Sequence, residues 1–226
     1  MYNTKKNIDK VKRGSHTFFL DPTEANLVKS KLKKDEYNIY ETYPECNKVI
    51  LYSDIKPKVK LYQIKSKIPL RHQDILGTLF SLNITNEMFG DIIVDNNNYY
   101  LYILDHIDNY IKTNLLFIRN CEIELEEKDI DYLSSYQQKY EENKIIVSSL
   151  RIDTIIARIT NTNRGSVIDK IKNKEILVNY NVLTKNSYIL KENDIFSIRK
   201  FGKYKFIGIE KTTKKDNYII KYLKYI

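Results

Sequence analysis

The amino-acid sequence predicts an α+β fold built from three small units. Helical apolar spacing begins after capping residues at several points, and short β-branched and tyrosine-rich runs lie between turn residues. A chain of 226 residues is also long enough for two to three small cores. The predicted units are an N-terminal α/β plait-like unit at residues 1–67, a central α/β unit at residues 68–145 and a C-terminal unit at residues 146–226.

The N-terminal unit is predicted from a capped helix followed by strands. In "FFLDPTEANLVKSKLKK", Asp21 is placed as N-cap, Pro22 as first helical residue and Glu24 as its capping-box partner, which predicts a helix to about Lys34. "NIYETY", "NKVILYS" and "KVKLYQIK" predict three strands separated by turns around residues 44–47 and 54–57.

The central unit is predicted to begin at a joint in "KSKIPLRHQD", because Pro69 follows a basic, non-periodic stretch. A helix at 71–84 follows, then a hairpin at 90–104 whose turn, Asp95–Asn98, contains asparagines that tolerate positive φ. A helix at about 106–116 and a strand at 121–127 complete this unit. The polar segment 128–143 is interpreted as a linker or an irregular helix.

The C-terminal unit is predicted to hold two short helices packed on a small antiparallel sheet. The helices fall at about Leu150–Ile159 and Arg164–Lys172. The strands that follow are predicted in "ILVNYNVL", "SYILKENDIFSIR", "KYKFIGIEKT" and "YIIKYLKYI".

Positive charge is concentrated near the C-terminus. The chain carries 38 Lys and Arg against 29 Asp and Glu, with a pI of about 9.2. From Val147 onward there are 17 Lys and Arg and 7 Asp and Glu, a net of +10, which leaves 21 against 22, or −1, for residues 1–146. Lysines scattered for solubility would spread evenly, so this distribution favours a polyanionic partner for the last third of the chain.

The two predicted C-terminal helices place arginines at positions suited to phosphate. Arg151 and Arg158 are seven residues apart and share one side of the first helix, away from the isoleucine stripe. Arg164 opens the second helix after the capping candidates Thr162 and Asn163, where a cation opposes the helix dipole but a phosphate would be favoured. Asp153 in the first turn has two open readings: a dipole stabiliser, or part of a binding surface.

The order of these residues resembles a known module. From "VSSLRIDTIIARI" through "NRGSVIDKIKNKEILVNYNVL" to "ENDIFSIRKFGKYKF", about residues 148–205, the chain is similar to the S-four-like RNA-binding domain. "RHQDILGTLFSLNITNEMFGDI" and "FFLDPTEANL" resemble the YlmH family of S-four-domain proteins. The resemblance therefore extends over most of the chain and implies a central RNA-binding-like unit before a C-terminal S-four-like domain.

This resemblance implies that both helices lie against structured RNA, with Arg151, Asp153 and Arg164 in the binding surface. The chain departs from the family at Lys174, where glycine is usual, so the left-handed cap must fall on Lys174 or move to Asn173. "VNYN" stands where the wider domain has Val-Asn-Gly. The full set of RNA-binding candidates is Arg151, Asp153, Arg158, Arg164, Lys170, Lys172 and Lys174, with Asn179, Lys185, Arg199, Lys203 and Lys205 on the sheet side.

By resemblance, the expected function is that of a non-enzymatic RNA-binding factor on the large ribosomal subunit, in rescue or quality control of stalled nascent-chain complexes. The expected partners are large-subunit rRNA and tRNA, with no membrane, no small-molecule substrate and no cofactor, and the protein is expected to be a cytoplasmic monomer. One alternative is an rRNA-modifying enzyme, of pseudouridine synthase or methyltransferase type, that uses the S-four-like domain for targeting. Another is a general tRNA or RNA chaperone of the small heat-shock kind.

The sequence offers little for catalysis. Its six glycines are never closer than six residues, so no glycine-rich cofactor loop is present. Cys46 and Cys121 stand in no zinc-type spacing, and the histidines have no neighbouring ligands at metal spacing. "RHQD" puts His72 and Asp74 two residues apart on a helix, where their side chains do not face each other. No apolar run approaches the ~18 residues that a membrane-spanning helix requires.

Overall fold

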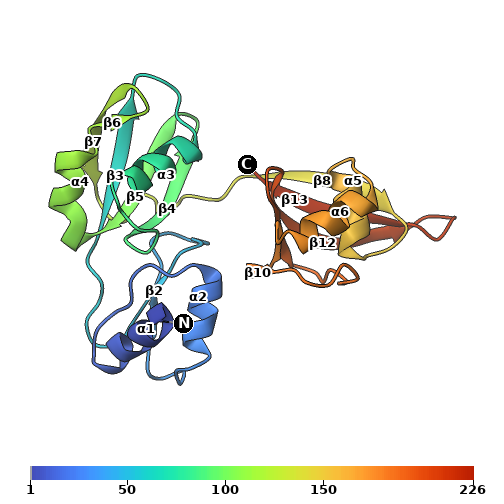
Figure 1. Ribbon diagram of the computed structural model, residues 1–226, viewed down its shortest axis with the longest axis horizontal. Coiled ribbons are helices and arrows are strands. Elements are labelled where there is room, and N and C mark those ends of the chain that lie inside the picture. The colour runs from blue at the N-terminus through green and yellow to red at the C-terminus, as the bar shows by residue number, and fades with distance from the viewer. Residues whose placement is uncertain (1) are drawn as a thin grey trace. The chain divides into compact units, whose positions relative to one another are not determined.

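The computed structural model describes residues 2–226, with side chains described from Thr4 onward. The chain divides into two compact units, one ending at Gln137 and one covering Gln138–Ile226 (Figure 1). The described part holds helices and three antiparallel sheets, which confirms the predicted α+β class.

The first unit begins with two helices and a two-stranded sheet: α1 (Tyr2–Lys12), α2 (Pro22–Lys29), β1 (Asn38–Tyr40) and β2 (Ile50–Tyr52). The capping box of α2 is confirmed, since Asp21 Oδ1 accepts the Glu24 N–H at 2.8 Å. The helix ends at Lys29, earlier than predicted, where the Ser30 hydroxyl donates to the Leu27 carbonyl. Helix α1 was not predicted, because its lysine-rich sequence has few apolar residues.

The larger sheet of the first unit has the strand order β4-β5-β3-β7-β6. Its elements are β3 (Val59–Ser66), α3 (His72–Ser81), β4 (Phe89–Asp95), β5 (Asn98–Leu104), η1 (Asp105–Ile107), α4 (Asp108–Asn114), β6 (Phe117–Ile118) and β7 (Cys121–Lys128). Strand β3, grouped with the N-terminal unit in the sequence analysis, is the central strand of this sheet. Its Leu61 belongs to one buried cluster and its Tyr62 and Ile64 to another, so both of its faces are covered.

The hairpin between β4 and β5 confirms the predicted asparagine turn. Asn96 and Asn97 have φ of 48° and 65°, which is the pair of left-handed conformations that a two-residue hairpin turn needs. Asparagine reaches this region at lower cost than most residues, because its short amide side chain bonds locally.

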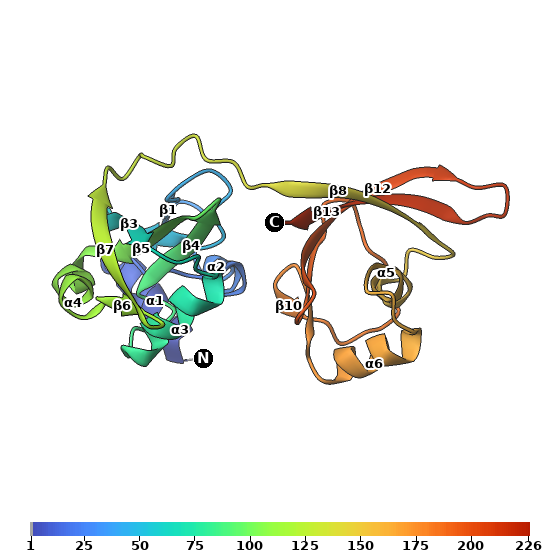
Figure 2. The same ribbon diagram turned by 90° about the horizontal axis from the view of Figure 1, so that it is seen from above.

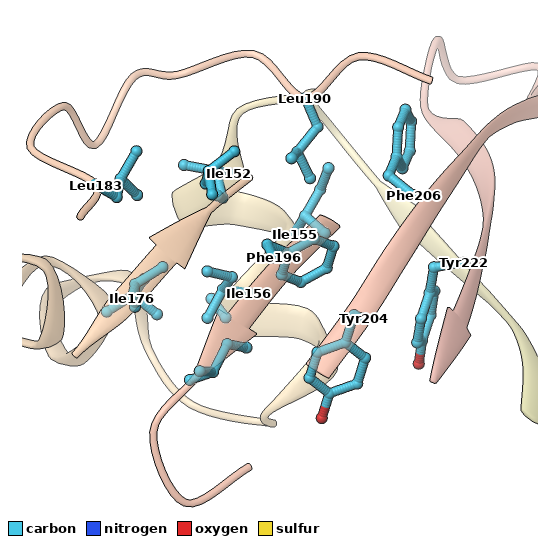
Figure 3. Packing of buried hydrophobic residues seen from close by; sticks show 14 of the residues in the cluster. Ile152, Ile155, Ile156, Ile176, Leu183, Leu190, Phe196, Tyr204, Phe206 and Tyr222 are labelled. Carbon is cyan, nitrogen blue, oxygen red and sulfur yellow. The ribbon is translucent and has the colours of Figure 1, made fainter. Parts of the chain in front are cut away.

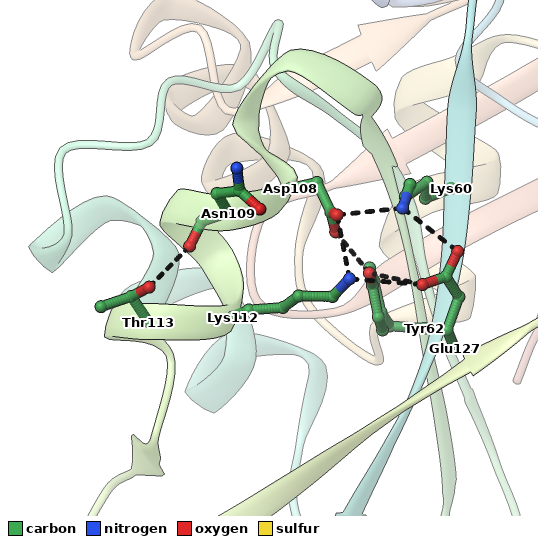
Figure 4. Close-up of polar contacts among 7 residues, drawn as sticks. All are labelled: Lys60, Tyr62, Asp108, Asn109, Lys112, Thr113 and Glu127. Atoms are coloured by element: carbon green, nitrogen blue, oxygen red, sulfur yellow. Dashed lines mark hydrogen bonds and ion pairs between the residues drawn. The ribbon is translucent and has the colours of Figure 1, made fainter.

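A charged network fixes α4 against β3 and β7 (Figure 4). Asp108 is buried and accepts hydrogen bonds from the Tyr62 hydroxyl and from the ammonium groups of Lys60 and Lys112, both at 2.9 Å. Both lysines also pair with Glu127, at 3.3 and 3.4 Å. Burial raises the pKa of Asp108, but these hydrogen bonds outweigh it and lower the pKa to about 2.

We expect Asp108→Asn to destabilise the first unit by about 1–3 kcal/mol, because two lysines lose a shared anion. Since the folded pKa of Asp108 lies below the ordinary value of 3.8 for this group, its stabilisation is present above about pH 4 and is lost as the pH falls through about 2. Hydrogen exchange of peptides from α4 would measure the loss, which should shrink on acidification. Asp105→Asn, an exposed neighbour, is the control; an equal loss there would contradict the assignment.

The second unit is built on one six-stranded sheet of order β10-β9-β11-β12-β13-β8. Its elements are β8 (Tyr140–Val147), α5 (Ile152–Ile159), α6 (Arg164–Lys172), β9 (Ile176–Val178), β10 (Asn181–Val182), β11 (Ile195–Ile198), β12 (Gly202–Thr212) and β13 (Tyr218–Tyr225). Figure 2 shows this sheet curling around α5 and α6. Both predicted helices and most predicted strands are confirmed.

Strand β8 was missed, because its segment was interpreted as a linker or an irregular helix. It pairs with β13 over its whole length, from Tyr140↔Tyr225 to Val147↔Tyr218. Only one face of β8 is covered and it lies at the sheet edge, so charged residues such as Glu142 and Lys144 are tolerated. The partner strand lies some 80 residues later, which is why local pattern did not reveal it.

The left-handed residue that ends α6, where the family usually has glycine, is Lys174 and not Asn173. Lys174 has φ of 59°, whereas Asn173 has φ of −77°. The Lys174 and Glu175 amides donate to the Ile171 and Lys170 carbonyls, which closes the helix. A non-glycine residue in this conformation costs about 1–2 kcal/mol. In "VNYN", Asn179 and Tyr180 have φ of 47° and 65°, so this turn also forms without glycine.

Candidate nucleic-acid interface

The helix α5 is anchored by its isoleucine stripe. Ile152, Ile155 and Ile156 are fully buried and pack with residues of β9, β11, β12 and β13 (Figure 3). Each such side chain contributes about 1.5–3 kcal/mol by leaving water. The stripe fixes the rotation of α5 about its axis and leaves Arg158 on the exposed side.

One buried carboxylate joins two of the predicted arginines. The Asp153 side chain has no exposed surface and accepts from Arg151 through Nε at 3.2 Å and a terminal nitrogen at 2.9 Å. Its Oδ2 also accepts from Arg164 at 2.8 Å, and the Thr154 hydroxyl donates to Oδ1 at 3.3 Å. The two arginine side chains keep 34% and 53% of their surface exposed. The buried Asp153 carboxylate therefore holds two partly exposed guanidinium groups close together from the protein interior.

The charge state of this cluster is fixed at physiological pH. Burial raises the pKa of Asp153, but the hydrogen bonds from Arg151 and Arg164 outweigh it, and the pKa falls to about 2. Asp153 is therefore ionised, while both arginines are cationic. The cluster carries a net charge of +1, and its exposed part consists of guanidinium groups.

Arg158 and Arg164 share a shallow depression of about 290 Å³. Its other lining residues come from the end of β8, from α5 and from the loop before α6: Ile146, Val147, Ser148, Thr154, Ala157, Asn161 and Thr162. Hydroxyl and amide groups next to two arginines suit the oxygens of a sugar-phosphate backbone.

The start of α6 supports this surface. Asn163 is the N-cap and its Oδ1 accepts the Ser166 N–H at 2.8 Å, so this predicted cap is confirmed. Arg164 opens the helix, where its charge opposes the dipole. The Asp153 ion pair offsets that cost within the protein, so the position of Arg164 does not by itself require a bound phosphate.

The lysines of α6 are less available than the arginines. Lys170 pairs with Glu175 at 3.2 Å and lies 5.4 Å from the Phe201 ring centroid, with 21% of its side chain exposed. Lys172 lies 3.8 Å from Asp169, with both side chains 72% exposed, so it stays accessible. Lys174 is exposed at the left-handed position that ends the helix.

The sheet-side candidates are dispersed. The Asn179 side chain donates to Asp194 Oδ1 and accepts a hydrogen bond from the Ile195 N–H, so it stabilises the turn that follows β9. Lys203 and Lys205 alternate along β12 with the buried Tyr204 and Phe206, so they point away from α5 and α6. Two further candidates are exposed outside regular structure: Lys185 and Arg199. The structure thus brings together Arg151, Asp153, Arg158 and Arg164, and leaves the sheet-side residues apart from them.

The described residues 2–226 contain no group of three or more His, Cys, Asp and Glu side chains that could hold a metal ion. In the same part of the chain, no helix has the length and apolarity needed to cross a membrane.

Sequence reasoning missed the neutral residues of the depression. Thr154, Asn161 and Thr162 line it, and Asn161 has φ of 50° just after α5. The available signal was "TNTN", a polar run between two helices, which predicts a loop but not the wall of a depression.

A cationic surface on a small α+β unit is typical of proteins that bind nucleic acid. Residues 57–132, in the first unit, match the family described as "Putative RNA-binding domain in YlmH". The chain is 25% identical over 215 residues to "Ribosome-associated protein quality control protein P2" of Bacillus subtilis (strain 168), covering 89% of this chain and 84% of that protein. The YlmH family match of residues 57–132 and the distant homology to that protein confirm the resemblance to the YlmH family.

A solved structure, "Cell division protein ylmH from Streptococcus pneumoniae", is similar at 20% identity with a TM-score of 0.48, covering 59% of this chain and 91% of that chain. The family match ends at residue 132. The S-four-like resemblance of residues 148–205 therefore stays a prediction.

Proposed function

We propose that this protein is a non-enzymatic RNA-binding factor that docks on structured rRNA or tRNA of the large ribosomal subunit, in rescue or quality control of stalled nascent-chain complexes. The observation that carries the proposal is the arginine face, defined as Arg151, Arg158 and Arg164 with Asp153 beneath them. Two of its guanidinium groups are held by one buried carboxylate and remain partly exposed. Such preorganised forks suit phosphate oxygens.

The proposal places an S-four-like domain at residues 146–226, within the second unit. Double-stranded RNA hides its base edges in a deep groove, so this face would recognise shape and phosphate positions more than sequence. The name of the Bacillus subtilis relative supports a ribosomal partner and quality control, and a cytoplasmic location follows from such a partner.

We expect Arg164→Glu to reduce co-sedimentation with large ribosomal subunits by at least about tenfold, because one phosphate contact becomes a repulsion. For wild type, the logarithm of affinity should fall with the logarithm of salt concentration with a slope of roughly −3 to −5 if about five phosphates are contacted, and Arg164→Glu should reduce that slope by about 1. Lys211→Glu, an exposed reversal on β12, is the control. Normal co-sedimentation of Arg164→Glu, or an equal loss in the control, would overturn the proposal.

A further inference from the structure

The region that matches an RNA-binding family has few free cations of its own. Residues 57–132 contain 8 Lys and Arg and 12 Asp and Glu, a net charge of −4. Five of the eight cations form ion pairs within the region: Lys60, Lys65, Arg71, Lys112 and Lys128. Binding to RNA depends on neutralising phosphates with cations. Three cations of the region remain outside these pairs, Lys58, Lys67 and Arg119, so cations from a neighbouring segment would add to its attraction for phosphates.

Helix α1 of the same unit supplies such cations. Residues 1–13 hold five Lys and Arg and one acidic residue, Asp9, a net of +4. A pocket of about 410 Å³ is lined by Lys5, Lys6, Asp9, Lys10 and Arg13; we call it the α1 pocket. Within the described part of the chain, none of these four cations forms an ion pair, in contrast to those of the sheet.

An aromatic ring connects the α1 pocket to the matched region. Lys10 Nζ lies 3.4 Å from the centroid of the Phe18 ring, and Lys6 Nζ lies 5.6 Å from it. The Phe18 ring is also 6.1 Å from the ring of His106, which belongs to the matched region. The cation–π contacts hold two lysine ammonium groups near one ring without neutralising them.

The cations of the α1 pocket repel one another. Partial burial lowers the pKa of Lys10, and the charge of Lys6 lowers it further, although Glu87 acts in the opposite direction. An anion placed between these groups would relieve the repulsion. From Thr4 onward, the apolar residues of α1 face inward, with Val11 buried and Ile8 packed on the core, so the described part of the helix offers no apolar face to a membrane.

We propose that the α1 pocket binds a backbone phosphate of RNA, as a second contact separate from the arginine face. This rests on the proposed function in one respect, that RNA is the ligand. Two contacts on one chain raise overall affinity beyond that of either alone, because the second binding event becomes intramolecular.

The test uses the full chain and a fluorescein-labelled structured RNA hairpin, with affinity measured by anisotropy at several salt concentrations. Lys6→Glu/Arg13→Glu changes two exposed residues of the α1 pocket, and Lys31→Glu/Lys33→Glu is the matched reversal of two exposed lysines after α2. The α1 variant should bind at least about fivefold more weakly, with a salt slope reduced by about 1–2, while the control changes affinity less than about twofold. Hydrogen exchange of α1 and α2 peptides verifies that both variants remain folded.

Unchanged affinity of the α1 variant, or an equal loss in the control, would overturn the inference. Loss of binding to phosphatidylglycerol vesicles with RNA binding intact would overturn it in favour of a lipid surface. The same pairs are measured in the Arg164→Glu background. If Arg164→Glu binds RNA normally and the α1 variant does not, the proposal for the arginine face is wrong and the proposal for the α1 pocket holds. If the α1 variant binds RNA normally and Arg164→Glu does not, the proposal for the α1 pocket is wrong and the proposal for the arginine face holds.

Discussion

Replacing Asp153 with alanine should destabilise the second unit by about 2–3 kcal/mol. The carboxylate is fully buried and accepts three hydrogen bonds from two arginines, and hydrogen bonds to charged groups contribute about 1.5–3 kcal/mol. Loss of the full value for a buried pair, about 3–5 kcal/mol, is not expected, because both guanidinium groups keep access to water. Urea unfolding, with the slope unchanged, would measure the loss.

Asp169→Ala is the matched control for stability. Asp169 is also acidic and near a cation, but it and its partner Lys172 are 72% exposed and 3.8 Å apart. Such a surface pair contributes at most about 1 kcal/mol. If the two substitutions cost the same, Asp153 would not be the anchor of the arginine face.

Asp153→Ala should also weaken RNA binding, although it removes a negative charge. Removing a charge about 6 Å from a phosphate gains roughly 0.7 kcal/mol in water. Releasing two arginine side chains means that each must be ordered again on binding, at about 0.5–1.5 kcal/mol each. The ordering cost is larger, so we expect about three- to tenfold weaker binding. Tighter binding would show that Asp153 only reduces the charge of the face.

Features encoded by neighbouring residues could be predicted from the sequence. The Asp21 and Glu24 capping box, the start of α6 after Asn163 and the asparagine turn of the β4–β5 hairpin each depend on residues within a few positions. In each case, one side-chain hydrogen bond or one φ preference decides the local conformation.

Features that depend on distant partners could not be predicted. Strand β8 forms because β13 pairs with it, and β3 becomes a central strand because β5 and β7 flank it. The alternation of apolar and polar residues predicts a strand, but it does not predict which strands pair with it.

The candidate site was predictable as a set of residue types but not as an arrangement. Arg151 and Arg164 were predicted from position and resemblance, whereas the bond of both to one buried Asp153 depends on how α5 and α6 pack together. The α1 pocket was missed because charge was summed over residues 1–146, where acidic residues of the sheet cancel the lysines of α1.

Replacing Ile156 with alanine should cost about 2–5 kcal/mol, through the lost transfer energy and the cavity left behind. Ile156 is fully buried in α5 among residues of the curled sheet, and a close-packed neighbourhood collapses little around a cavity (Figure 3). Urea unfolding of the second unit would measure the loss, and hydrogen exchange of α5 peptides would locate it.

Ile209→Ala is the control for Ile156→Ala, because it removes the same atoms from the same unit at a position that does not line the depression. Ile209 is 44% exposed on β12, so its truncation should cost less than about 1 kcal/mol. The comparison also bears on function, because α5 carries Arg158 and begins beside Arg151. If burial of the isoleucine stripe positions the arginine face, Ile156→Ala should loosen exchange in α5 and weaken RNA binding together, while Ile209→Ala should change neither. Weakened binding with unaltered α5 exchange would separate the arginine face from the core beneath it.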